Sequence, residues 1–113
     1  MDVPYAIRCD HLDQLRQIQS DLATLSPKPW LISPMGGYLG LGWWQIMLSQ
    51  AKDWPMLLDC GHSAGLCMAA IRLRIPCFCA TLPAPIAAKI ADMAQQVGCR
   101  MLPPPGEIRN HPL

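Results

Sequence analysis

Apolar residues recur along this chain with a helical period in some segments and as short continuous runs in others. Between residues 10 and 25, leucine and isoleucine fall three or four positions apart, which is the spacing of one helix face. The continuous runs are four to six residues long, the length of a buried strand. The predicted strands are residues 5–9, 30–33, 55–60, 76–80 and 99–102, and the predicted helices are residues 10–25, 43–51, 64–75 and 85–97.

Residues typical of helix ends stand at the borders of these segments. Asp10 and Ser63 suit helix N-termini. Pro85 suits a first helical turn, and Gly98 suits a helix end. Five strands thus alternate with four helices, and strands that are apolar on both faces are typical of a parallel sheet of βαβ units. The sequence predicts an α/β fold, either half of a TIM-like barrel or an open doubly wound sheet.

Length and composition set the domain organisation. The 113 residues suit one domain but are too few for a closed eight-stranded barrel with its helices. We expect a single domain over residues 1–102 and a loose proline-rich tail over residues 103–113. Only 15% of the residues are charged, so little charge is available to cover the surface and the two bare sheet edges. We therefore expect a homodimer.

Charge and hydropathy argue against several function classes. The net charge is +1 and the nine Lys and Arg residues are scattered along the sequence, so we expect no nucleic-acid binding. No apolar run approaches the roughly 20 residues that a membrane span needs, and the first residues lack a signal-peptide pattern. We expect a cytoplasmic protein whose six cysteines are reduced and mostly buried. None forms a CxxC pair, and no cofactor is expected.

A cluster of reactive side chains, Asp59, Cys60 and His62, lies at the carboxyl end of the third predicted strand and precedes a helix. Ligands of parallel α/β proteins bind at the carboxyl ends of strands, and the N–H groups of a helix N-terminus favour an anion. Asp59 could act as a general acid or base, and Cys60 with His62 could bind zinc. The alternative is purely structural: Asp59 or Ser63 caps the helix, Gly61 permits the turn, and Cys60 is buried.

A glycine-rich segment, PMGGYLGLG at residues 34–42, follows the second predicted strand. Ser33, Gly36 and Gly37, together with Gly61 and Ser63, are candidates for binding a phosphate-bearing small molecule, since glycine lets the backbone approach a phosphate. The segment lacks both the Lys-Ser/Thr pair of a P-loop and the GxGxxG spacing. A strand-to-helix loop without a ligand is the alternative.

From Gly37 to Gly98 the sequence resembles the zinc-dependent class II fructose-bisphosphate aldolases and their tagatose-bisphosphate relatives. The matching residues are Gly36, Gly37, Tyr38 and Gly40 in a glycine loop and LLDCG at residues 57–61, where the family has H-L-D-H-G. The resemblance implies that Asp59 stands at the position of a proton-donating Asp and Cys60 at that of a zinc-binding His. Leu57 replaces the other histidine, and the family's later zinc and phosphate segments have no counterpart here.

We therefore expect a non-catalytic, aldolase-like protein that binds a small molecule or anion, or that assembles with a partner. Two alternatives stay open: an aldolase-type lyase completed by a second subunit, and a thiol-based metal or redox sensor that uses Cys60 with His62 and a second chain. An open pocket holding Asp59, Cys60 and Ser33 would favour binding or catalysis, whereas a filled one would favour a structural role.

Overall fold

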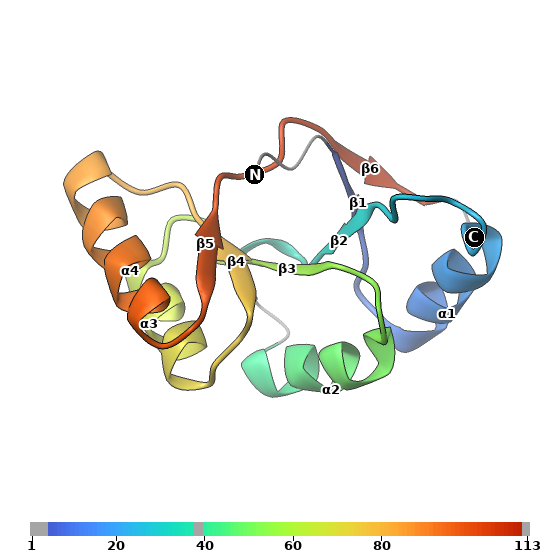
Figure 1. The fold of residues 1–113 in the computed structure, drawn as a ribbon, viewed down its shortest axis with the longest axis horizontal. Coiled ribbons are helices and arrows are strands. Elements are labelled where there is room, and N and C mark those ends of the chain that lie inside the picture. The colour runs from blue at the N-terminus through green and yellow to red at the C-terminus, as the bar shows by residue number, and fades with distance from the viewer. Residues whose placement is uncertain (1–4, 38–39, 112–113) are drawn as a thin grey trace.

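The structure, a computed structural model, describes residues 5–37 and 40–111. Six parallel strands form one open sheet in the order β5-β4-β3-β2-β1-β6, with four α-helices (Figure 1). The strands are β1 (Ala6–Arg8), β2 (Trp30–Ile32), β3 (Met56–Asp59), β4 (Cys77–Cys79), β5 (Arg100–Leu102) and β6 (Ile108–Asn110). The helices are α1 (Leu12–Asp21), α2 (Leu41–Ala51), α3 (Ala64–Arg72) and α4 (Ala84–Gln96), and a short 3-10 helix, η1, covers Met35–Gly37. No described helix is long and apolar enough to cross a membrane.

The predicted α/β fold is confirmed, and the sheet is not closed into a barrel. Strands β1 to β5 lie side by side in chain order, so each helix connects two neighbouring strands. Right-handed crossovers between such neighbours place every helix on the same face of the sheet. Figure 1 shows α1 to α4 around the outside of a curved sheet. The first five strands therefore resemble half of a barrel more than a doubly wound sheet, which carries helices on both faces.

The sixth strand departs from the sequence prediction. A loose tail is predicted after residue 102, but Ile108–Asn110 pairs in parallel with β1, so that Ile108 aligns with Ala6 and Asn110 with Arg8. The Ala6 N–H also donates to the Glu107 carbonyl oxygen at 3.0 Å. The side chains of β6 are all exposed. Backbone hydrogen bonds hold this strand, and the hydrophobic pattern carries no sign of it.

The helix ends agree with the sequence in part. Ser63 caps α3, as expected. The N-cap of α1 is His11 instead of Asp10, and its Nδ1 accepts from the Gln14 N–H at 3.1 Å. This helix ends at Asp21, so Leu25 lies beyond it and is 42% exposed.

Alternate residues of the strands face two different layers. The outer layer, between sheet and helices, holds large fully buried side chains such as Trp44, Leu58 and Phe78. The inner face holds a smaller cluster whose members are at most 6% exposed: Ala6, Ile32, Leu57, Cys79 and Leu102. The chain thus buries the middle of its inner face by itself. The bare edges of the sheet remain a reason to expect a homodimer.

Candidate functional site

The carboxyl ends of β1, β2 and β3 bring Arg8, Ser33 and Asp59 together. Ala6 and Leu57 belong to the inner cluster, so Arg8 and Asp59, two residues further along their strands, face the same side. Arg8 Nη1 lies 3.5 Å from Asp59 Oδ2 and also donates to the Ser33 carbonyl oxygen. The side chains of Arg8 and Asp59 are 25% and 14% exposed. The pair is therefore partly screened by water and accessible from outside.

Asp59 closes the turn that follows β3. Its Oδ1 accepts from the Gly61 N–H at 2.9 Å, and its own N–H donates to Ser33 Oγ at 2.8 Å. Ser33 Oγ in turn donates to the Pro34 carbonyl oxygen at 3.0 Å. Ser33 is almost completely buried, so its hydroxyl links the ends of β2 and β3 and does not face solvent.

The glycines after β2 and β3 lie close to one another. Gly61 has φ +60°, which favours glycine, and a Cβ there would come within 3.3 Å of Met35 Cγ and 3.5 Å of Gly36 N. Gly37 ends η1, and Tyr38 lies outside the described residues. Ser63 Oγ accepts from the Leu66 N–H at 3.0 Å, so its acceptor is used by the helix.

Cys60 and His62 lie next to this site but have different surroundings. Cys60 is fully buried in the outer layer, where a hydrogen bond with Cys67 and burial raise the pKa of its thiol. His62 is exposed, and its Nδ1 lies 3.2 Å from the Thr81 carbonyl oxygen. Over residues 5–37 and 40–111, no three His, Cys, Asp or Glu side chains gather as metal ligands would.

Cys79 is a further neighbour of Asp59, because the two residues align between β4 and β3. Burial and the nearby Asp59 raise the pKa of the Cys79 thiol to about 12, against the opposing effect of Arg8. The thiol is therefore protonated at neutral pH, and a protonated thiol is a poor nucleophile. The arrangement offers a guanidinium and a carboxylate, which suit binding, and the thiol beside them, Cys79, is not activated.

Sequence reasoning missed Arg8. It is the one charged residue in the predicted strand at residues 5–9, and charged residues in buried strands normally have a partner. That signal points to a site at the end of β1. Its partner Asp59 is 51 positions away, so only the strand order identifies it.

No protein-family model, curated protein or solved structure matches this chain. The resemblance to class II aldolases accordingly rests on the quoted residues alone and stays a prediction.

Proposed function

We propose that this protein binds a small molecule through a phosphate or carboxylate group at the carboxyl-edge site, formed by Arg8, Ser33, Asp59 and Gly61. The observation that carries the proposal is the hydrogen bonding of Arg8. Its Nη1 is used by Ser33 and Asp59, whereas no described residue accepts from Nε or Nη2, and a quarter of the side chain is exposed. A guanidinium with donors to spare is well suited to phosphate and carboxylate groups.

The site supports binding without turnover. Both oxygens of Asp59 already accept hydrogen bonds, one from Gly61 and one from Arg8. The pKa of the Cys79 thiol is raised, which leaves it neutral. Asp59 also repels a second anion on its own side, so the ligand's anionic group is expected on the other side of the guanidinium. The chain is therefore proposed to act as a non-catalytic binding protein, with no aldolase-type activity of its own.

Titration with inorganic phosphate at constant ionic strength, followed by amide NMR shifts, tests this proposal. We expect the Asp59 and Gly61 amides to shift in the native protein and to stay unchanged in Arg8→Gln. Arg16→Gln is the matched control, because Arg16 is an exposed arginine of α1 whose side chain is 65% exposed. An equal response in the two variants would contradict the proposal. NMR spectra of a folded protein for both variants would show that a lost response is not caused by unfolding.

The free edge of β5 favours a second candidate function, self-assembly. β5 pairs with β4 on one side only, and a bare edge invites another strand. Hollows of about 410 and 340 Å³ lie between this edge and α4. Their shared lining consists of Ala91, Met101, Leu102 and Pro103. We propose that a second copy of the chain packs here to form a homodimer.

Light scattering after size exclusion tests the homodimer. The native chain is expected to show a dimer mass at micromolar concentration, and Met101→Lys is expected to show a monomer mass. A monomer mass for the native chain across a tenfold dilution range would contradict self-assembly and would leave the proposed small-molecule binding unaffected.

A further inference from the structure

Positive charge gathers at the edge of the sheet opposite to the carboxyl-edge site. Because all strands are parallel, the residues that directly precede them share one edge. Lys28 precedes β2 by two residues, Lys52 precedes β3 by four, and Arg74 precedes β4 by three. Arg100 begins β5, and Arg72 ends α3. These are five of the nine Lys and Arg residues, so more than half of the cations lie along one edge of the sheet.

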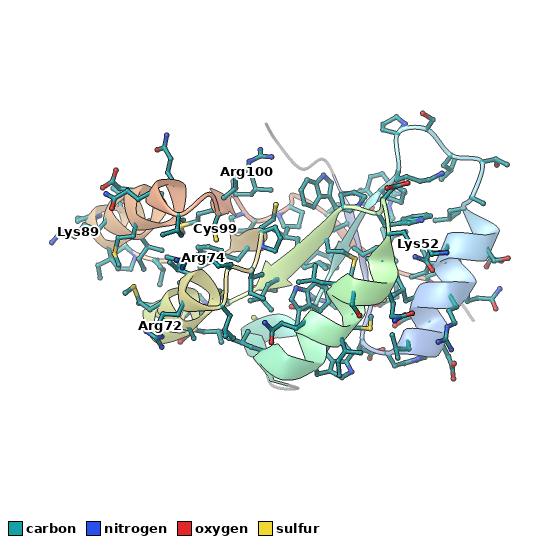
Figure 2. The ribbon with its side chains drawn as sticks, turned by 60° about the horizontal axis from the view of Figure 1, so that its bottom comes forward. Lys52, Arg72, Arg74, Lys89, Cys99 and Arg100 are labelled. Atoms are coloured by element: carbon teal, nitrogen blue, oxygen red, sulfur yellow. The ribbon has the colours of Figure 1, made fainter. Side chains whose placement is uncertain are left out.

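Few carboxylates lie on this amino edge. Asp53 follows Lys52, and Glu107 precedes β6, where it pairs with Arg109 at 2.8 Å. In the described part of the chain, no carboxylate lies within ion-pair distance of Lys52 or Arg100. Figure 2 shows Lys52 beside the end of α2, with Arg72, Arg74 and Arg100 beside α3 and β5.

A hollow of about 330 Å³ opens at the same edge, where β2, β3 and β4 begin. We call it the amino-edge pocket. Its walls are mainly apolar and include Trp30, Leu48, Trp54, Met56 and Cys77. Its single charged lining residue is Lys52. A mostly apolar pocket with one or two placed polar groups is the usual form of a small-molecule site, and this volume is at the low end of the range of roughly 300–1,000 Å³.

Two further cations flank the pocket walls. Lys28 Nζ lies 5.3 Å from the Trp54 ring centre, and it also donates to the carbonyl oxygens of Ala23 and Leu25. This contact holds the Trp54 ring in place. Arg100 aligns with Cys77 of the neighbouring strand and is exposed. Both residues add positive charge around the pocket, and Lys52 is the cation that lines it.

The backbone of Lys52 is in a conformation that lysine rarely adopts. Its φ is 56° and its ψ is −120°, and the Trp54 N–H donates to the Ala51 carbonyl oxygen at 3.1 Å. These values describe a type II′ turn with Lys52 at its first central position, where glycine is favoured. Strained residues of this kind gather at functional sites, because elsewhere a less strained residue serves the fold better.

We propose that the amino-edge pocket binds a small molecule that carries a planar aromatic ring and an anionic group. The ring packs against Trp30 and Trp54, and the anion pairs with Lys52. The volume suits a single ring system with its substituent and not a large cofactor. A nucleoside monophosphate and an aromatic carboxylate share this chemistry, and the two sources are separated by experiment. This site is distinct from the carboxyl-edge site and does not depend on it.

NMR titration of the full chain tests the proposal through the indole N–H signals of Trp30 and Trp54. The probes are AMP, benzoate, adenosine and inorganic phosphate, which separate the ring from the anion. We expect AMP or benzoate to shift both indole signals, and the better of the two identifies the source. Adenosine and phosphate are each expected to bind at least ten-fold more weakly than the better probe.

Two glycine variants supply the matched comparison. Lys52→Gly is expected to melt at a higher temperature than the native chain and to lose at least ten-fold in affinity for the better probe. Arg74→Gly removes the same charge at another residue with positive φ, 57°, that does not line the pocket. It is expected to melt higher as well but to keep the affinity. Lys52→Gln, which changes the charge but keeps a side chain, should also lose affinity.

Four results would overturn the proposal. Equal probe affinity in Lys52→Gly and Arg74→Gly would mean that the edge charges only support the helix ends. Phosphate binding as tight as AMP binding would remove the role of the tryptophans. A short single-stranded oligonucleotide that binds far more tightly than AMP would instead identify the edge as a nucleic-acid surface. Loss of the AMP response in Arg8→Gln, with its fold intact, would place the ligand at the other edge.

Discussion

At the carboxyl edge of the sheet, Arg8 lies 3.5 Å from Asp59 and donates to a backbone carbonyl, whereas at the amino edge Lys52 and Arg100 have no described carboxylate at ion-pair distance. The backbone conformations of the turns at the two edges also differ. The carboxyl-edge turn after β3 has glycine at positive φ, namely Gly61, while at the amino edge the turns before β3 and β4 have Lys52 and Arg74 there and only the turn before β5 has a glycine, Gly98. The carboxyl edge thus has a glycine turn and a paired arginine, whereas the amino edge has two strained turns, at Lys52 and Arg74, and two cations, Lys52 and Arg100, without a described carboxylate partner.

This difference bears on where a ligand is expected in an α/β protein. The general rule places ligands at the carboxyl ends of the strands, where Asp59 and Ser33 lie. Here most of the polar groups at that end bond to the chain itself, which leaves Arg8 as the open position. The amino edge has a competing explanation, because cations near helix C-termini also stabilise the helix dipole, and Arg72 lies in the last turn of α3. The free energies of unfolding of single variants show which of these residues support the fold.

The largest effect is expected from Asp59→Ala. This change leaves the Gly61 N–H without its acceptor and Arg8 without its carboxylate. We expect a loss of about 2 kcal/mol in the free energy of unfolding, a value at the low side for such pairs because both side chains are partly exposed. Urea denaturation checks it.

Asp59→Asn divides that loss between its two causes. The amide oxygen of asparagine still accepts from Gly61, while the negative charge beside Arg8 is gone. We expect this variant to retain at least half of the stability that Asp59→Ala loses. If the two variants are equally destabilised, the ion pair with Arg8 and not the hydrogen bond to Gly61 stabilises this edge. The two edges would then differ in the pairing of their charges and not in the stability of their turns.

A smaller effect is expected at the helix ends, where α3 and α4 finish in the same way with different residues. The Ile75 N–H donates to Ala70 in the first and the Cys99 N–H to Ala94 in the second, and the residues at positive φ are Arg74 and Gly98. Glycine is the favoured residue in this position. We expect Arg74→Gly to raise, and Gly98→Ala to lower, the free energy of unfolding by about 1 kcal/mol, or roughly 4 °C in melting temperature.

A Cβ at Gly98 has no other atom within 4 Å, so Gly98→Ala measures backbone strain without a steric clash. This makes it the matched control for Arg74→Gly. If Arg74→Gly lowers the stability instead, the arginine contributes more to the α3 end, through its 3.0 Å hydrogen bond to the Ile71 carbonyl oxygen, than its backbone strain costs. The amino edge would then be explained by fold support.

The sequence predicts the first five strands and the four helices because each has a local pattern. Apolar runs mark β1 to β5 within two residues at either end, and Ser63 marks the start of α3. The sixth strand has no such pattern, since Ile108, Arg109 and Asn110 are exposed and held by backbone bonds to β1. Its existence depends on which edge the chain reaches after β5, which is a property of the whole fold.

The candidate site is predictable to the same extent. Asp59, Gly61 and Ser33 can be identified from the sequence because they lie at or just after strand ends, and the structure brings them together. Arg8 and the amino-edge pocket cannot be identified from the sequence, because the residues involved are distant along the chain. Lys28 lies over the Trp54 ring, and Arg100 aligns with Cys77 of the neighbouring strand. Sequence spacing alone made the cations look scattered, although Lys28, Lys52 and Arg74 shortly precede strands of one parallel sheet and Arg100 begins another.

The smallest expected effect concerns the end of the chain that joins β6 to α1. His111 Nε2 lies 2.8 Å from Asp21 Oδ2, and this hydrogen bond, with a second from Gln17, holds the pKa of the Asp21 carboxyl below its ordinary value. A lowered folded-state pKa means that the contact stabilises the fold at neutral pH and is lost as the pH falls through that value. Hydrogen exchange of the β6 amides should therefore be faster in Asp21→Asn than in the native chain at pH 7. The difference should vanish in acid, once Asp21 is protonated in the native chain as well.

Asp92→Asn is the control, because Asp92 hydrogen-bonds Gln96 on the remote helix α4 and should leave β6 exchange unchanged. A difference between Asp21→Asn and native that persists unchanged into acid would show that the charge of Asp21 does not hold this strand, and β1 pairing alone would account for it.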